Sequence, residues 1–193
     1  MVDAEICLVE RYVDRWIVAG IIWFSWSAVL VFIVTSAVTL CLGHSLGMHR
    51  KLIHESFDCP LWLDRVFVYH GTLVGLGGPF GMMVMHDMRD WAQQQGACHP
   101  FLSHQSGIVR DFWWQLHCKL HLDYPPEYHV PQRIAQDRFY RFVDWSWIAQ
   151  QLPLALMLFA LGGVGWVAWG ICGWVTVSVF GHWLIGYFAH NEG

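Results

Sequence analysis

Charged residues are spread very unevenly along this chain of 193 residues. No Asp, Glu, Lys or Arg occurs from Trp16 to Gly43, or from Trp145 to Asn191. Each of these two runs is longer than the roughly 20 apolar residues that cross a bilayer as a helix. The pattern predicts an integral membrane protein, with a membrane helix over residues 16–43 and a membrane hairpin over residues 145–190.

Glycine-rich sequences divide the apolar parts of the chain. The second run is interrupted at 161–165 by Leu-Gly-Gly-Val-Gly, where we expect the turn of the hairpin. Within the more polar middle segment, 44–144, the uncharged stretch 66–85 is broken by Gly-Leu-Gly-Gly-Pro, so we expect an interfacial helix rather than a straight span there. The predicted fold is one all-α membrane domain, 1–193, with about three membrane-spanning helices, an interfacial helix and a cytoplasmic histidine-rich helical segment.

The composition supports this assignment and limits the partners. Only 13% of the residues are charged, against about 25% in soluble domains. The net charge is −4 and no basic cluster is present, so no nucleic-acid partner is expected. Nine of the eleven Lys and Arg residues lie between Arg50 and Arg141, and by the positive-inside rule the middle segment faces the cytoplasm. The six cysteines form no C-x-x-C pair, which argues against a disulfide framework or a zinc ribbon.

Histidines gather where the apolar runs end. His49 and His54 follow the first run, His190 ends the second on the same predicted side, and His86 opens the polar part of the middle segment. Clustered imidazoles are typical ligands of iron, zinc and copper. A five-residue step turns through about 140° on a regular α-helix, so His49 and His54 can share a metal only where the helix ends or loosens.

Several motifs resemble one family. Residues 47–57, Gly-Met-His-Arg-Lys-Leu-Ile-His-Glu-Ser-Phe, resemble the first histidine box, G-x-H-R-x-x-x-H-x-S-F, of the membrane-bound fatty-acid desaturases. Gly71-Thr72-Leu73 and Gly77-Gly78-Pro79, followed by His86, resemble the approach to that family's second box. The resemblance covers roughly residues 36–193. Its less specific parts are Phe112-Trp113-Trp114, residues 137–142, Trp183-Leu184 and Ala189-His190-Asn191.

The resemblance implies an oxidoreductase that uses O₂ to insert a double bond into an acyl chain. It implies two non-haem irons, with His49, His54, His86 and His190 as the matched ligands. The acyl chain would be carried by coenzyme A, a carrier protein or a lipid, within membrane lipids. A separate electron donor is expected, because the sequence has no dinucleotide-binding G-x-G-x-x-G fingerprint and no C-x-x-C-H haem attachment.

The chain also departs from the family pattern. Where the second box has H-x-x-H-H, this sequence has His86-Asp87-Met88-Arg89-Asp90, and it stops at Gly193 before the family's final H-x-x-H-H box. Its amino end accounts for only one helix of the family's first membrane hairpin. We therefore expect either a fragment or a reduced relative, whose site other histidines complete. The available substitutes are His99, His104, His117 and His121.

Two alternatives to a working desaturase follow. With four matched ligands, the chain by itself is expected to form no unsaturated product, which mass spectrometry of acyl lipids would detect. It would then be an incomplete or non-catalytic relative. The other alternative is a membrane electron carrier in which His44 and His182, from different spans, clamp a haem.

Overall fold

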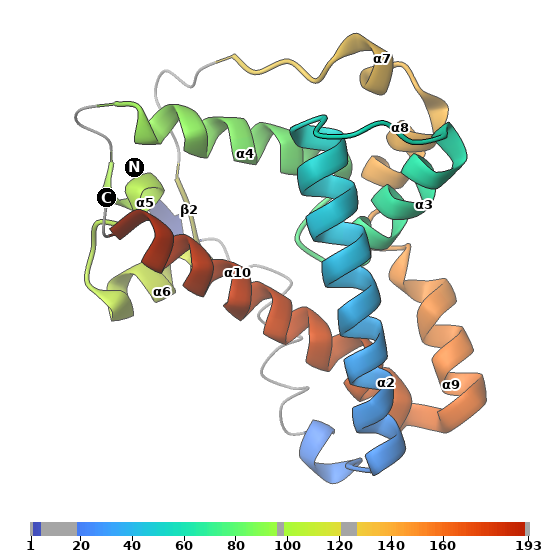
Figure 1. The fold of residues 1–193 in the computed structure, drawn as a ribbon. Coiled ribbons are helices and arrows are strands. Elements are labelled where there is room, and N and C mark those ends of the chain that lie inside the picture. The colour runs from blue at the N-terminus through green and yellow to red at the C-terminus, as the bar shows by residue number, and fades with distance from the viewer. Residues whose placement is uncertain (1, 5–18, 96–98, 121–126, 192–193) are drawn as a thin grey trace.

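The computed structural model describes residues 2–4, 19–95, 99–120 and 127–191, and it is mainly helical (Figure 1). The first long helix consists of α2 (Trp26–Ser36) and the π-helix η1 (Ala37–Ile53), which continue into one another. The last one consists of α9 (Gln151–Val167), the short π-helix η2 (Ala168–Gly173) and α10 (Trp174–Asn191). The elements between them are α3 (Leu61–Thr72), α4 (Pro79–Gln93), α5 (Pro100–Ser103), α6 (Ile108–His117), β2 (Cys118–Leu120), α7 (Gln132–Ala135) and α8 (Arg138–Trp145).

Two helical segments in the described part of the chain are long and apolar enough to cross a membrane, Trp26–Ile53 and Gln151–Ala189. The second is bent sharply at Gly163, whose φ of 69° and ψ of −160° are not helical. In Figure 1, α9 and α10 form the two arms of the expected hairpin. The 12 residues of α9 that precede Gly163 measure about 18 Å as a helix, less than the roughly 30 Å hydrocarbon core. The count of three spans therefore stays a prediction.

Two tryptophan hydrogen bonds join the bend of this hairpin to the start of α2 and to the residues just before it. The indole Nε1 of Trp166 donates to Ser27 Oγ at 3.2 Å, and that of Trp169 donates to the Gly20 carbonyl at 3.0 Å. Indoles favour the boundary between membrane and water. This end of the molecule, at the bottom of Figure 1, therefore has the chemistry of a membrane interface.

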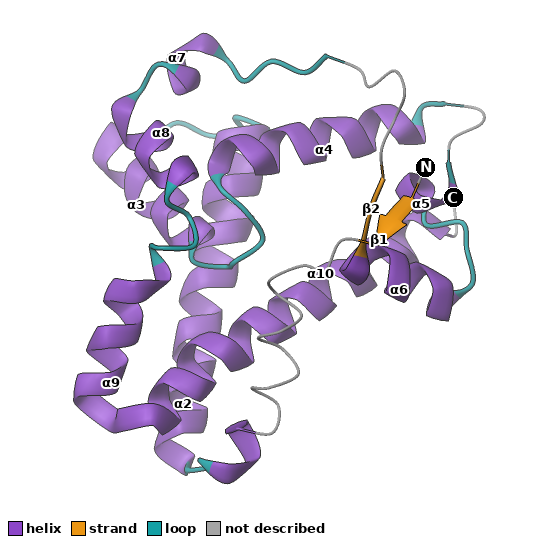
Figure 2. Ribbon diagram, turned by 180° about the vertical axis from the view of Figure 1, so that it is seen from behind, coloured by secondary structure: helices purple, strands orange, loops and turns teal. Residues whose placement is uncertain are grey.

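The expected interruption near Gly75 is confirmed, because α3 ends at Thr72 and α4 begins at Pro79. Gly75 and Gly77 have φ values of 81° and 151°, which residues with a side chain rarely adopt. An interfacial position for this stretch stays a prediction. One feature was not expected: β1 (Val2–Ala4) pairs antiparallel with β2, with Val2 opposite Leu120 (Figure 2). Such a short pairing between distant segments leaves no periodic signal in the sequence.

Glycines bring η1 and α3 into direct backbone contact. A Cβ atom on Gly43 would overlap the backbone of His70 and Gly71, and one on Gly47 would lie 2.7 Å from the Phe67 carbonyl carbon. The spacing Gly43-x-x-x-Gly47 is the small-residue pattern that lets membrane helices approach closely. The first long helix therefore packs closely against α3 because it has no side chains at Gly43 and Gly47.

Polar contacts then connect α3 to α8 and α8 to α4. The Tyr140 hydroxyl donates to Asp64 Oδ2 at 2.9 Å, and Arg65 Nη2 lies 2.8 Å from Asp137 Oδ2. Burial by itself raises the pKa of Asp137, but hydrogen bonds from Arg65 and from backbone amides outweigh it and lower the pKa overall. Asp144 at the end of α8 accepts from the Phe80 amide at 2.9 Å and so satisfies a free N–H at the start of α4.

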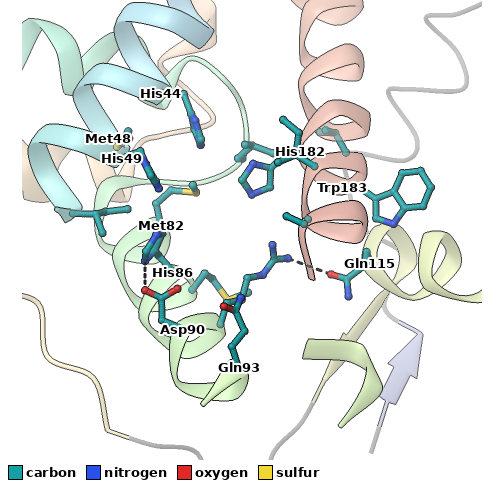
Figure 3. A pocket seen from close by; sticks show the side chains of 18 of the residues that line it. His44, Met48, His49, Met82, His86, Asp90, Gln93, Gln115, His182 and Trp183 are labelled. Atoms are coloured by element: carbon teal, nitrogen blue, oxygen red, sulfur yellow. Dashed lines mark hydrogen bonds and ion pairs between the residues drawn. The ribbon is translucent and has the colours of Figure 1, made fainter. Parts of the chain in front are cut away.

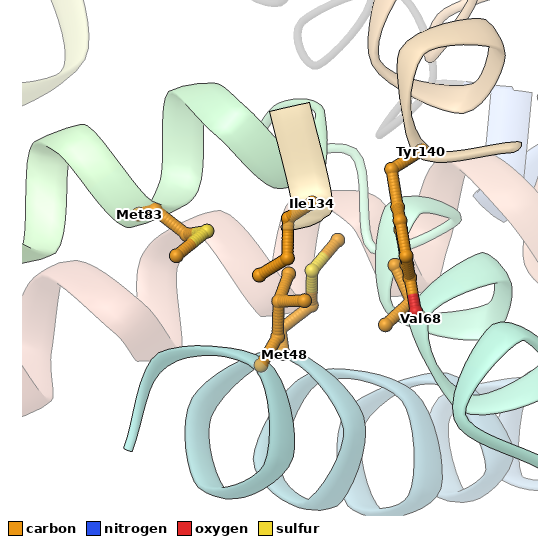
Figure 4. Packing of buried hydrophobic residues seen from close by; sticks show 6 residues of the cluster. Met48, Val68, Met83, Ile134 and Tyr140 are labelled. Atoms are coloured by element: carbon orange, nitrogen blue, oxygen red, sulfur yellow. The ribbon is translucent and has the colours of Figure 1, made fainter. Parts of the chain in front are cut away.

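A small apolar cluster fills the space between these elements (Figure 4). Met48 and Leu52 come from η1, Val68 from α3 and Met83 from α4, and each is less than one tenth exposed. Ile134 and Tyr140, from α7 and α8, complete the cluster. Residues almost 100 positions apart thus share one core, which holds η1 and α4 side by side.

The glycine contact gives a stability test. Gly43→Ala should lower the free energy of unfolding by about 1 to 3 kcal/mol, because the new methyl group forces two backbones apart. Gly81→Ala is the matched control: nothing lies within 4 Å of its Cβ position in α4, so alanine should be neutral or stabilise by about 0.5 to 1 kcal/mol. Thermal unfolding in detergent measures both. Equal midpoints for the two variants would contradict the close contact.

Candidate metal centre

The π-helix η1 places His49 and His54 on one face. Its hydrogen bonds join residues five apart, and the His54 amide donates to the His49 carbonyl at 3.0 Å. The two Nε2 atoms are 3.3 Å apart, with ring centroids at 4.5 Å. The expectation that these histidines meet where the helix loosens is therefore confirmed, and the loosening extends over 17 residues.

His86 joins them from α4. Its ring centroid lies 5.2 Å from that of His49 and 4.8 Å from that of His54. Each ring has one nitrogen that can bind a metal, and these three nitrogens all lie within 4.8 Å of one another. Three imidazoles from two rigid helices can hold one metal ion and leave open positions for other ligands.

Asp90 supports this group from one helical turn further along α4. Its Oδ2 lies 3.3 Å from His86 Nδ1. A carboxylate on the second nitrogen of a metal-binding imidazole fixes the orientation of the ring and raises its basicity. The contact, dashed in Figure 3, is an ion-pair distance without hydrogen-bond geometry. Asp90 is in position to support His86 when the other ring nitrogen binds the metal.

A cavity of about 490 Å³ opens beside the histidines, framed by η1, α4 and α10 (Figure 3). His44 and His49 line it from η1, His86 lines it from α4, and His182 lines it from α10. Much of the remaining wall is apolar, including Met82, Met85, Leu76, Val179 and Ile185. This volume is typical of pockets that hold small organic ligands.

The sequence did not predict that the side chain of Arg89 lines this cavity. Its Nη2 donates to Gln115 Oε1 at 3.2 Å, the hydrogen bond that ends at Gln115 in Figure 3. Burial lowers the pKa of its guanidinium, and the charge of Asp111 partly offsets this. Because the ordinary pKa of arginine is so high, the side chain stays protonated and cannot act as a ligand.

Of the remaining candidate histidines, the three whose side chains are described lie outside the group. His99 caps α5 by accepting from the Phe101 amide at 3.1 Å, His104 Nδ1 lies 2.9 Å from the buried Asp111 carboxylate, and His117 lies against Trp113. His121 lies outside the described residues. His190 is in the last turn of α10, but its side chain also lies outside what is described; its neighbour Ala189 lines the cavity.

The haem alternative finds no support in this arrangement. His44 and His182 do come together, from η1 and α10, as the alternative requires. Their rings, however, are in edge-to-face contact with centroids 5.4 Å apart. A haem between two axial histidines needs the thickness of the porphyrin and both iron–nitrogen bonds between the rings, and this contact leaves no such gap.

Sequence comparison with curated proteins identifies relatives over almost the whole chain. The chain is 32% identical to an sn-1 stearoyl-lipid 9-desaturase of Synechocystis sp. over 179 residues, which cover 89% of this chain and 53% of that protein. It is 30% identical to an sn-2 palmitoyl-lipid 9-desaturase of Nostoc sp., covering 89% of this chain and 60% of the relative. An acyl-CoA 5-desaturase of Anemone leveillei is 26% identical over 88% of this chain and 53% of its own length.

Over 88% to 89% of its length, the chain is thus similar to curated fatty-acid desaturases. It spans a little more than half the length of these three relatives. No family model and no solved structure matches it. The resemblance read from the histidine box is therefore confirmed for the family.

The candidate ligands fit one metal better than two. Within the described part of the chain, His49, His54 and His86 are the group whose ligand atoms converge. At the two positions after His86 where the family box has histidines, Arg89 offers no lone pair and Asp90 faces His86. The residues present can hold one iron, and the second iron implied by the resemblance is not provided for by this group.

Iron binding should depend on these residues. His54→Ala should lower iron affinity at least about tenfold, because removing a ligand costs no less than removing a supporting group. His70→Ala and His129→Ala are controls, since His70 bonds its own helix at the Val66 carbonyl and His129 is exposed outside α4 and η1. Iron content per chain after desalting measures the effect. Equal iron in all three variants would remove the assignment.

Proposed function

We propose that this chain is a desaturase-type oxidoreductase that acts on an acyl chain at a non-haem iron centre. The observation that carries the proposal is the convergence of three imidazoles, two of which line a largely apolar cavity. The names of the relatives support an acyl chain on a lipid or on coenzyme A as the substrate class. His190, at the end of α10 beside the cavity, is the proposed fourth ligand.

Different residues of the chain have different roles in this proposal. His49, His54 and His86 hold the iron, which when bound supplies the activation of O₂ needed to oxidise an unactivated C–H bond. The apolar wall of Met82, Met85, Val179 and Ile185 holds the acyl chain and excludes water from it. Two hydrogens leave adjacent methylenes. With O₂, two electrons and two protons from outside, the products are one double bond and two waters, so an external electron donor is a required partner.

The position of the metal group at one end of the apolar helices supports a membrane location. The basic middle segment carries the α4 side of the site, and we propose that this face lies in the cytoplasm. The bend at Gly163 and its tryptophans then lie at the opposite face of the membrane.

Acyl binding beside the iron can be tested without turnover. The ferrous protein is treated with nitric oxide and a stearoyl lipid deuterated along its chain, and pulsed EPR measures deuterium coupling to the iron–nitrosyl spin. Coupling is expected in the wild type. It should be lost in Ile185→Trp, which fills the cavity, and kept in Leu184→Trp, one residue along α10 outside the cavity wall. Coupling of equal strength in both variants, with equal iron content, would contradict the proposed substrate position.

The orientation can be tested by thiol labelling. Single cysteines replace Gly163 and Gln105 in a cysteine-free background, and a membrane-impermeant maleimide is added to intact cells and to inverted vesicles. Position 163 should react only in intact cells and position 105 only in inverted vesicles. Reaction of both from the same side would refute the hairpin.

A further inference from the structure

A buried positive charge faces the cavity next to the three histidines. Arg89 lines the cavity, and among the described residues its hydrogen-bond partner is the neutral side chain of Gln115. No described carboxylate lies within 4.0 Å of its guanidinium. The buried Asp111, whose charge acts on Arg89, has His104 Nδ1 and Trp183 Nε1 next to its Oδ2, both at 2.9 Å. Arg89 therefore lines the site without a paired carboxylate among the described residues.

The guanidinium reaches across to α10. A Cβ atom built on Gly186 would lie 3.7 Å from Arg89 Nη1 and 3.1 Å from His104 Nε2. The absence of a side chain at Gly186 leaves the room that the guanidinium uses. Arg89 thus extends from α4, three residues after His86, to the opposite wall of the cavity.

Among the described residues around Arg89, the metal ligands are too few for a second metal ion. His44 and His182 lie in ring contact there, and the Nε2 of His44 is buried without a hydrogen-bond partner. Two imidazoles make a weak site, since structural and catalytic metal sites use three or four protein ligands. The protonated guanidinium adds five N–H donors, no acceptor and a repulsive charge.

We propose that the metal centre of this chain is mononuclear and that Arg89 takes the place a second metal ion would need. The inference rests on the proposed iron-binding function, but it differs from the two-iron expectation that the family resemblance raised. In the H-x-x-H-H pattern, the third residue after the first histidine supplies a ligand for the same cavity. Here that position supplies a fixed cation, and the fourth position supports His86.

Iron stoichiometry and spectroscopy test the proposal on the full chain. The purified protein is loaded with ferrous iron without oxygen, desalted and analysed for iron per chain. The wild type should hold about one iron. Arg89→His combined with Asp90→His, which restores H-x-x-H-H, should raise this about twofold. Arg89→Gln removes the charge without adding a ligand, and Arg141→His adds an imidazole on the exposed surface of α8; both should match the wild type.

EPR keeps the test decisive if the double variant does not fold. In the oxidised wild type, a mononuclear centre gives an isolated high-spin ferric signal whose spin concentration equals the iron concentration. Two coupled irons per wild-type chain, with no such signal, would overturn the inference and leave the proposed function standing. A folded double variant with unchanged iron content would also overturn it. No bound iron in a folded wild type would defeat the proposed function itself.

Discussion

The backbone contact of Gly43 and Gly47 with α3 is the constraint on which the rest of the structure depends. It sets the position of η1 relative to α3. Further contacts then fix α8 and α4 relative to α3, and so fix the three histidines relative to one another. Asp64 and Arg65 on α3 hold α8 through Tyr140 and Asp137. Asp144 on α8 then holds the start of α4, which carries His86. The three imidazoles meet because every step of this series is a direct contact between rigid helices.

The number of residues per helical turn in η1 is the second determinant of the site. On an α-helix, residues five apart diverge, and a metal could bind His49 and His54 together only at a frayed end. The π-helical hydrogen bonding at the end of η1 brings His49, in the last turn, into line with His54, the residue that caps the helix. Single π-helical turns are often associated with functional sites, and the extended π-helix here carries both the glycine contact and two of the ligands.

The exchange of ligands for Arg89 and Asp90 changes the electrostatics of the cavity. The family pattern would surround two cations with neutral imidazoles. In this chain, three converging imidazoles and the guanidinium of Arg89 lie at a cavity whose wall is largely apolar. The described residues thus combine a largely apolar cavity with fewer candidate metal ligands than the family pattern has.

The sequence by itself determined the features that depend on neighbouring residues. Two uncharged runs defined the apolar helices, and glycines defined the break before Pro79 and the bend at Gly163. The first histidine box and the approach to the second indicated the family and the three histidines that converge. Tertiary structure decided which distant residues meet. The π-helical form of η1, the direction of Arg89 and the contact of His44 with His182 depend on packing against other helices. Hydrophobic periodicity reports only whether a position faces lipid or protein, and so it carries no information on which partner a side chain contacts.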